Sequence, residues 1–205
     1  MLISRKRLGQ LILLLLITPA LHAQEALLAE GDIIFQSNIS PQCKAIELAT
    51  NSKYSHCGIL FKKDGEWYVY EAIQPVQQTS YKDWIARGGQ HFAVKRLKGA
   101  DSLVTADVIL KMKLAGRKYQ GKNYDSYFGW SDDRIYCSEL VWKIYKEATD
   151  LEVGELKPMR EYDLSHPVVK ATMRERYGNN IPLNEKMVSP GNIYKSPLLT
   201  TVVEQ

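Results

Sequence analysis

The chain has 205 residues, enough for one well-packed domain with room for an elaboration. Hydrophobic residues make up 45% of it and charged residues 24%, which are ordinary globular values and exclude the disordered and fibrous classes. The formal net charge is +4, and the first residues of the chain account for most of it.

The N-terminus has the pattern of a secretory signal peptide. Residues 5–7 are basic, an apolar run covers residues 11–17, and small residues lead up to Ala23. A membrane anchor is the alternative, but the run is well short of the roughly 20 apolar residues that span a bilayer. We therefore predict cleavage after Ala23, with Ala20 as second choice. Cleavage removes three basic residues and lowers the net charge from +4 to +1, so no nucleic-acid partner is expected.

Residues 24–205 are expected to form the mature domain. In chain order we predict a strand at 30–36, a short amphipathic helix at 40–50, a β-hairpin at 54–73 that turns at Lys63-Asp64-Gly65, a strand at 91–97, a helix at 103–114 that ends before Gly116, a loop at 119–134 and an amphipathic helix at 137–149. From about residue 150 a loop-rich C-terminal elaboration is expected. The fold class is therefore α+β, with a small antiparallel sheet packed against helices.

The three cysteines remain after cleavage, and an odd number in an oxidising compartment leaves at least one without an intrachain partner. A Cys43–Cys57 disulfide stays open. Cys137 begins the predicted helix at 137–149, where the positive end of the macrodipole favours the thiolate, the form that attacks carbonyls. Helical spacing also directs Cys137 inward, and on this ground alone a buried, inert cysteine is the stronger interpretation.

A nucleophilic cysteine needs a base and a group that orients the base. Of the four histidines, His56 begins the first strand of the hairpin and is followed closely by a glycine. The other three are interpreted as lying outside any site: His22 belongs to the leader or its edge, and His91 and His166 are taken as solvated residues. His56 is therefore the candidate base.

Strand parity supplies the orienting group. With a two-residue Asp64-Gly65 loop, Glu71 faces Gly58, diagonal to His56; a register shifted by two residues makes Glu71 face His56 directly. Both registers place His56 and Glu71 on one face of the sheet, because side chains alternate with a period of two, whereas a three-residue loop or a bulge would separate them. A carboxylate there supports protonated imidazole, whereas the alternative is an exposed strand-end charge. Cys57 must point to the opposite face, so we expect a small core residue outside the site.

Signatures of other enzyme classes are missing from the sequence. No group of residues has the spacing of a zinc site, and there is neither a Gly-x-Ser-x-Gly elbow nor a Gly-rich phosphate loop. We therefore expect no metal and no cofactor, and the chemistry would be carried by side chains alone.

Five sequence blocks resemble the NlpC/P60 cysteine peptidase superfamily in a rotated order. Ordinary members read a Gly-x-x-Tyr loop, a Cys-Ser that begins a helix, a Gly-Asp strand, a strand that begins with His-x-Gly, and a partner strand with a polar residue before Ala. This chain reads GDIIF, HCGILF and YEA, and only then GKNYD and YCSELVW. It is similar to the circularly permuted papain-like group, most closely the exported bacterial YiiX-like (YaeF/YiiX) proteins, over residues 31–145 and more loosely beyond.

The resemblance implies a role for each matching residue. Cys137 would be the nucleophile, His56 the general base and Glu71 the third, orienting residue, while Tyr124 and Ser138 would be oxyanion or substrate-binding residues. Glu71 is a departure, since ordinary members often carry His, Asn or Gln there. The implied reaction is amide hydrolysis through a Cys137 thioester, with the Cys137 backbone N–H and the Tyr124 hydroxyl meeting the oxyanion.

The substrate class also rests on the resemblance. A periplasmic or secreted amidase of this group, with no membrane span after cleavage, would meet cell-wall peptides and cut a γ-D-glutamyl–diamino acid bond. A lipid or ester acyl hydrolase or acyltransferase is one alternative, which a continuous apolar surface at Cys137 would favour. A non-catalytic peptide- or glycan-binding module is another. Glu139 would support the helix dipole or, less favoured, contact a substrate amine.

Overall fold

The structure, a computed structural model, describes residues 24–89 and 91–205; the predicted signal peptide at 1–23 lies outside the described residues. Its centre is a six-stranded sheet in the order β10-β5-β1-β2-β3-β4, and each neighbouring pair is antiparallel. The strands are β1 (Ile33–Gln36), β2 (His56–Lys63), β3 (Glu66–Glu71), β4 (Gln77–Ser80), β5 (Phe92–Leu97) and β10 (Leu199–Glu204). Two small sheets pair β6 (Asn123–Tyr124) with β7 (Arg134–Ile135) and β8 (Lys157–Pro158) with β9 (Lys186–Met187).

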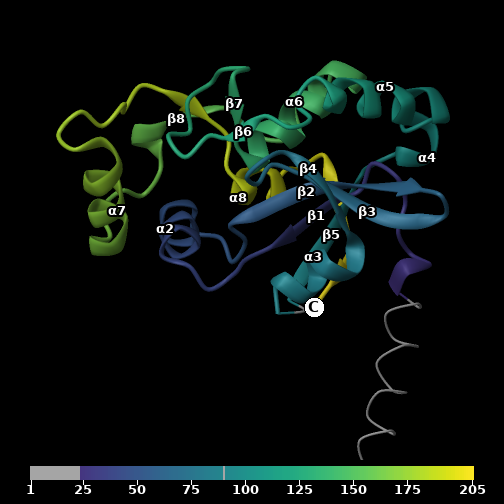
Figure 1. Cartoon of the computed structure of the whole chain (residues 1–205), viewed down its shortest axis with the longest axis horizontal. Coiled ribbons are helices and arrows are strands. Elements are labelled where there is room, and N and C mark those ends of the chain that lie inside the picture. Colours follow the sequence, from purple (N-terminus) through teal and green to yellow (C-terminus); the bar gives the residue numbers. More distant parts are fainter. Residues whose placement is uncertain (1–23, 90) are drawn as a thin grey trace, which may run out of the picture.

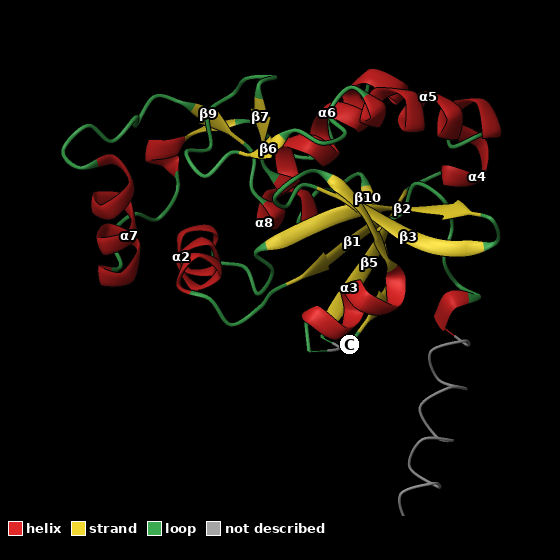
Figure 2. Cartoon of the chain, in the orientation of Figure 1, coloured by secondary structure: helices red, strands yellow, loops and turns green. Residues whose placement is uncertain are grey.

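Helices cover both faces of the large sheet (Figure 1). Two helices, α5 (Ala106–Arg117) and α6 (Cys137–Thr149), lie on one face, and α3 (Tyr81–Arg87) lies on the other. A second pair, α2 (Pro41–Thr50) and α7 (Pro167–Tyr177), pack against each other beside the sheet, at the left of Figure 2. The short helices are α4 (Ala100–Leu103), a 3-10 turn at Met159–Glu161 and α8 (Pro190–Tyr194). Within the described residues, no helix combines the length and apolarity needed to cross a bilayer.

The predicted α+β class is confirmed, and several elements differ from expectation. Strand β4 and helix α3 lie in a stretch for which no element was predicted, and β6 lies inside the predicted loop at 119–134. Helix α5 does not end before Gly116 but runs through it to Arg117. A glycine is needed inside this helix because a Cβ at Gly116 would lie 2.9 Å from the Tyr70 ring, whose hydroxyl donates to the Gly116 carbonyl at 2.6 Å. The segment after residue 150 is more regular than the loop-rich elaboration predicted, since it contributes α7, α8 and the edge strand β10.

The β2–β3 hairpin has the predicted two-residue turn. Lys63 pairs with Glu66, and the intervening Asp64 and Gly65 adopt φ values of 53° and 87°, as a tight hairpin turn requires. The register brings Gly58 against β3, where a Cβ would lie 2.5 Å from Val69 Cγ1 and 2.8 Å from the Tyr70 carbonyl oxygen. Only glycine lets the two strands approach this closely.

Gly58→Ala is therefore expected to lower the free energy of unfolding by about 1–3 kcal/mol, because the new methyl group overlaps a backbone oxygen that belongs to the sheet. Denaturant unfolding followed by circular dichroism measures the change. Gly129→Ala is the matched control, since its new Cβ meets nothing closer than 3.4 Å. Equal stability of the two variants would contradict the close approach at Gly58.

Candidate active site

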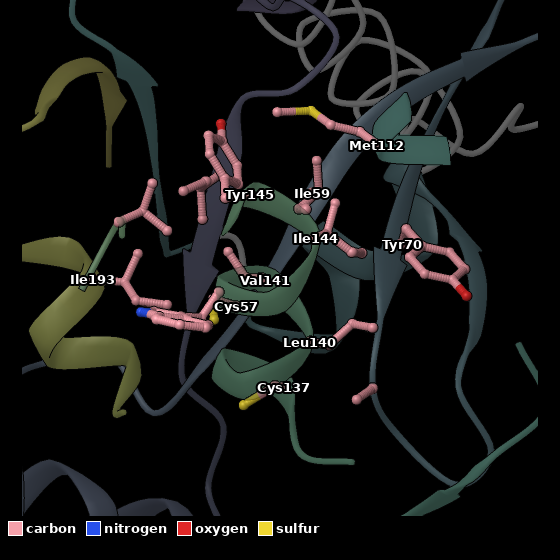
Figure 3. Close-up of a cluster of buried hydrophobic side chains, with 14 of the residues drawn as sticks. Cys57, Ile59, Tyr70, Met112, Cys137, Leu140, Val141, Ile144, Tyr145 and Ile193 are labelled. Atoms are coloured by element: carbon pink, nitrogen blue, oxygen red, sulfur yellow. The ribbon is translucent and has the colours of Figure 1, made fainter. Parts of the chain in front are cut away.

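The predicted site residues come from three elements that meet at one end of the sheet. Cys137 is the first residue of α6, His56 the first residue of β2 and Glu71 the last residue of β3. Figure 3 shows Cys137 at the start of α6, with Leu140 further along the helix. Cys137 therefore comes from the α5–α6 face, whereas the histidine and the carboxylate are carried by the hairpin.

Glu71 is fully buried and receives hydrogen bonds from several elements. His56 Nε2 lies 2.5 Å from its Oε2, and Arg87 Nη2 contacts both carboxylate oxygens at 2.5 and 2.7 Å. Thr79 Oγ1 and Trp84 Nε1 donate to the same carboxylate at 2.5 and 3.0 Å. The predicted contact between His56 and Glu71 is confirmed, and the alternative of an exposed strand-end charge is wrong.

The partners of Glu71 other than His56 were not predicted from the sequence. Thr79 belongs to β4, and Trp84 and Arg87 belong to α3, a stretch in which no motif was recognised. Their spacing of three residues places Trp84 and Arg87 on one side of a helix, which was the only signal for them. The Trp84 ring also stacks beside His56, with centroids 6.2 Å apart.

The charges of the site support one another. Burial by itself lowers the pKa of His56, but the thiolate of Cys137 and the carboxylate of Glu71 raise it to about 10. Burial likewise opposes the ionised form of Glu71, and its contacts with His56, Arg87 and Thr79 outweigh burial and bring its pKa to about 2. Near neutral pH the geometry therefore favours an imidazolium held between a thiolate and a carboxylate.

Cys57 is a buried core residue, as predicted, but it also neighbours Cys137, which was not predicted. Its side chain points to the face opposite His56, as parity requires, and joins the core under α6. Because Cys137 approaches over that same face, the Cys57 thiol donates to it. The Cys57 thiol makes the largest contribution to lowering the pKa of Cys137. Burial raises this pKa and the His56 cation lowers it, so that it lies well below its ordinary value. All three cysteines are described and each is a free thiol, so no Cys43–Cys57 disulfide is present.

Tyr124 and Ser138 differ in what their side chains do. Tyr124 neighbours Cys137, and burial together with the thiolate charge raises the pKa of Tyr124 well above its usual value, so the phenol keeps its proton and can act as a donor. The buried Ser138 hydroxyl donates instead to the Val188 carbonyl at 2.9 Å. Its side chain thus fixes the start of α6. The role of Ser138 in binding the oxyanion or the substrate stays a prediction.

Glu139 is buried in the first turn of α6 and turns back toward the helix start. Its Oε2 accepts the Tyr136 backbone N–H at 3.3 Å, and its Oε1 lies 2.8 Å from Lys143 Nζ. These contacts agree with support of the helix N-terminus, the preferred interpretation of this residue.

Two neighbouring hollows lie at this end of the sheet, and Cys137 lines the first of them. A small cavity of about 70 Å³ lies between α2, α7 and the start of α6. Its walls are largely apolar and include Ala45, Ile46, Ala49, Phe128, Tyr136, Met159, Leu164, Val169, Met173, Met187 and Val188. A larger, open cleft lined by His56 and many polar side chains lies beside it, and Tyr124 and Arg176 line both. This cavity was not predicted, because α7 was placed in a loop-rich segment.

A cysteine at a helix start, facing a histidine and a carboxylate on an antiparallel hairpin that precedes it in the chain, is the arrangement of a papain-like protein with permuted order. Residues 27–203 match the model of the permuted papain-like amidase family YaeF/YiiX, C92, and the chain belongs to this family. The predicted family and fold are thereby confirmed, and membership in an amidase family supports hydrolase activity.

Two relatives from Escherichia coli are similar to the chain over most of its length. The uncharacterized protein YiiX of strain K12 is 47% identical over 176 residues, which are 85% of this chain and 86% of that protein. The crystal structure of the metalloprotein YiiX from strain O157:H7 matches with a TM-score of 0.82 at 47% identity, covering 86% of this chain and 97% of that one.

Proposed function

We propose that this protein is a cysteine amidase that cleaves its substrate through a thioester on Cys137. The observation that carries the proposal is the chain of charges formed by Cys137, His56 and Glu71, which lowers the pKa of the thiol and raises that of the imidazole. A thiolate beside a protonated histidine has the two groups that acyl transfer needs, a nucleophile and an acid for the leaving group.

The reaction follows from this arrangement. The Cys137 thiolate attacks the amide carbonyl carbon, and the oxyanion accepts hydrogen bonds from the Cys137 backbone N–H and the Tyr124 hydroxyl. His56 transfers its proton to the leaving nitrogen as the C–N bond breaks, which releases the amine and leaves the thioester. Neutral His56 then removes a proton from water, whose oxygen attacks the thioester. Breaking the C–S bond releases the acid and restores the thiolate–imidazolium pair.

For the substrate we propose an amide with an apolar acyl group, and an ester of the same acid as its analogue. The cavity beside Cys137 supports this choice, because a saturated chain would bury its surface against α2 and α7 side chains such as Ile46 and Met173. The polar cleft would then hold the leaving group. Cell-wall peptides with a γ-D-glutamyl–diamino acid bond, the first expectation from the sequence, become the second candidate.

We also propose that the protein is exported, on the basis of the basic and apolar pattern of its first 23 residues. A periplasmic or secreted location would give it access to both envelope lipids and cell-wall peptides. Cleavage would leave the described domain, which begins at residue 24, intact.

A metal has no part in the proposed steps. One relative is described as a metalloprotein, but among residues 24–89 and 91–205 no three His, Cys, Asp or Glu side chains form a group that could hold a metal ion. The ligand sets typical of protein zinc sites need at least three such side chains. The described residues therefore do not fit a resident metal.

Filling the cavity tests the acyl assignment. Ala49→Phe is expected to lower kcat/KM for an N-dodecanoyl amide by at least about tenfold and to change that of the N-acetyl amide far less, because the lost methylene contacts are worth about 0.8 kcal/mol each. Ala171→Phe, on the exposed side of α7, is the control. Hydrolysis is followed by mass spectrometry, with cell-wall peptides as a parallel arm. Cleavage of peptides but of no acyl amide would overturn the acyl assignment and leave the amidase.

A further inference from the structure

Arg176 stands where the apolar cavity and the polar cleft meet. It belongs to the last turn of α7 and lines both hollows together with Tyr124. The centre of its guanidinium lies 4.8 Å from the Phe128 ring centroid, a cation–π contact that holds the group against the cavity wall. Its side chain is half-buried, so its charge is only partly solvated.

The polar partners of Arg176 are neutral. Its Nη2 donates to Gln42 Oε1 at 3.3 Å, and it interacts with the Tyr177 hydroxyl. In the described chain the arginine ion pairs are Arg87–Glu71 and Arg96–Asp32, and Arg176 has none. A guanidinium has five N–H donors, so most of those on Arg176 are open to a ligand.

Nearby carboxylates are engaged elsewhere or exposed. Asp125 accepts the backbone N–H groups of residues 127 and 129 at 2.9 and 2.8 Å, and Glu185 accepts that of residue 130 at 2.9 Å. Glu175, which lines the cleft, is solvent-exposed, so its charge is well screened.

The other charges of the site balance one another. The Cys137 thiolate faces the His56 cation, and the Glu71 carboxylate faces Arg87. Arg176 is thus the positive charge at the mouth that the site's own groups leave uncompensated.

We propose that Arg176 binds an anionic group, a carboxylate or a phosphate, on the amine part of the substrate, which leaves when the thioester forms. The inference rests on the proposed function, since it concerns the leaving group of that acyl amide. A planar guanidinium forms paired hydrogen bonds with either anion, and half-burial strengthens them. The preferred substrate would then join an apolar acyl chain to an anionic amine, as an acylated amino acid or an acylated amino-alcohol phosphate does.

The test compares substrates that differ only in charge. The first pair is N-dodecanoylglycine and N-dodecanoylglycinamide, and the second is N-dodecanoylethanolamine with and without an O-phosphate. The wild-type protein should have a higher kcat/KM for the anionic member of at least one pair, and the pair that shows it identifies carboxylate or phosphate. Arg176→Gln should reduce this anionic-to-neutral ratio by about 10- to 100-fold, the usual effect of losing hydrogen bonds to a charged group.

Two controls separate recognition from structure. Arg174→Gln removes an exposed arginine of the same helix that lines neither hollow, and it should keep the wild-type ratio. Arg176→Lys should recover part of the ratio, because lysine keeps the charge but not the paired geometry. An equal loss on both members of a pair in Arg176→Gln would mean that the residue only supports the cavity, and the inference would be overturned.

Binding to the Cys137→Ala variant keeps the inference distinct from the proposed function. Titration calorimetry with N-dodecanoylglycine and its amide needs no turnover, and Arg176→Gln in this background should weaken binding of the acid selectively. If no acyl amide is hydrolysed but this selective binding is found, the amidase proposal fails and the anion site stands. If neutral amides are hydrolysed with no preference for an anion, the inference fails and the amidase stands.

Discussion

Replacing Cys137 with alanine is expected to lower the turnover of any amide that the protein cleaves by a factor on the order of 10⁶, close to the loss of a nucleophile in other enzymes with such triads. The thioester cannot form without the sulfur, and what remains is binding and oxyanion stabilisation. Initial rates on the N-acyl amides and on cell-wall peptides measure the loss, and the melting temperature shows that the variant folds. Retained hydrolysis in Cys137→Ala would remove Cys137 as the nucleophile.

Cys137 should also react faster with an alkylating reagent than an ordinary thiol does. At about pH 6 an ordinary thiol is almost fully protonated, whereas the lowered pKa of Cys137 increases its thiolate fraction. We expect iodoacetamide to modify Cys137 at least about ten times faster than Cys43, which serves as an internal control and lines the open cleft. Peptide mapping by mass spectrometry separates the two sites. Equal rates would support the alternative of a non-catalytic binding module.

Replacing Glu71 with glutamine is expected to lower kcat/KM by about 10²- to 10⁴-fold, in the range found when the orienting carboxylate of a triad becomes an amide. The amide removes the charge that holds His56 protonated and leaves Arg87 without its counterion. Glu66→Gln, the same substitution at the exposed start of β3, is the matched control and should retain wild-type kinetics.

The pH profile shows whether Glu71 acts through His56. The His56 pKa is raised from 6.5 to about 10, so the imidazolium is present below that value and is lost as the pH rises through it. Without the carboxylate this pKa falls, and the alkaline limb of kcat/KM should move to lower pH in Glu71→Gln. An unchanged limb with unchanged turnover would remove Glu71 from the site.

The hairpin part of the site could be predicted because it depends on local rules. A two-residue turn at Asp64-Gly65 determines the register, and the register determines that His56 and Glu71 share a face. Cys137 could be placed at a helix start by the periodicity that follows it. These inferences need only the alternation of a strand and the period of a helix.

The remainder of the site depends on packing between distant elements. Cys57 was predicted to lie outside the site because strand parity says nothing of a helix that approaches over the other face of the sheet. Arg87 becomes a partner of Glu71 only when α3 packs beneath the hairpin. Arg176 reaches the site through the packing of α7 on α2. Because 116 residues lie between these two helices in the chain, no local sequence pattern predicts the contact.

The presence of Arg87 also accounts for the departure at the third position. The resemblance to NlpC/P60 proteins predicts His, Asn or Gln there, whereas a fully buried glutamate needs a counterion as well as hydrogen bonds. Arg87 supplies both, through contacts with each carboxylate oxygen. Glutamate and arginine are therefore expected to change together among related chains.

The cavity is formed by α2 and α7, whereas His56 and Glu71 are carried by the sheet. Substrate selectivity and the chemical step therefore depend on different elements of the fold. Under the proposed function, Ala45 and Ala49 lie one helical turn apart on the cavity side of α2 and determine how deep a chain can reach. Larger or smaller residues at these positions would reset the accepted chain length without touching a reacting atom. Such a division lets selectivity diverge between relatives while the chemistry is inherited unchanged.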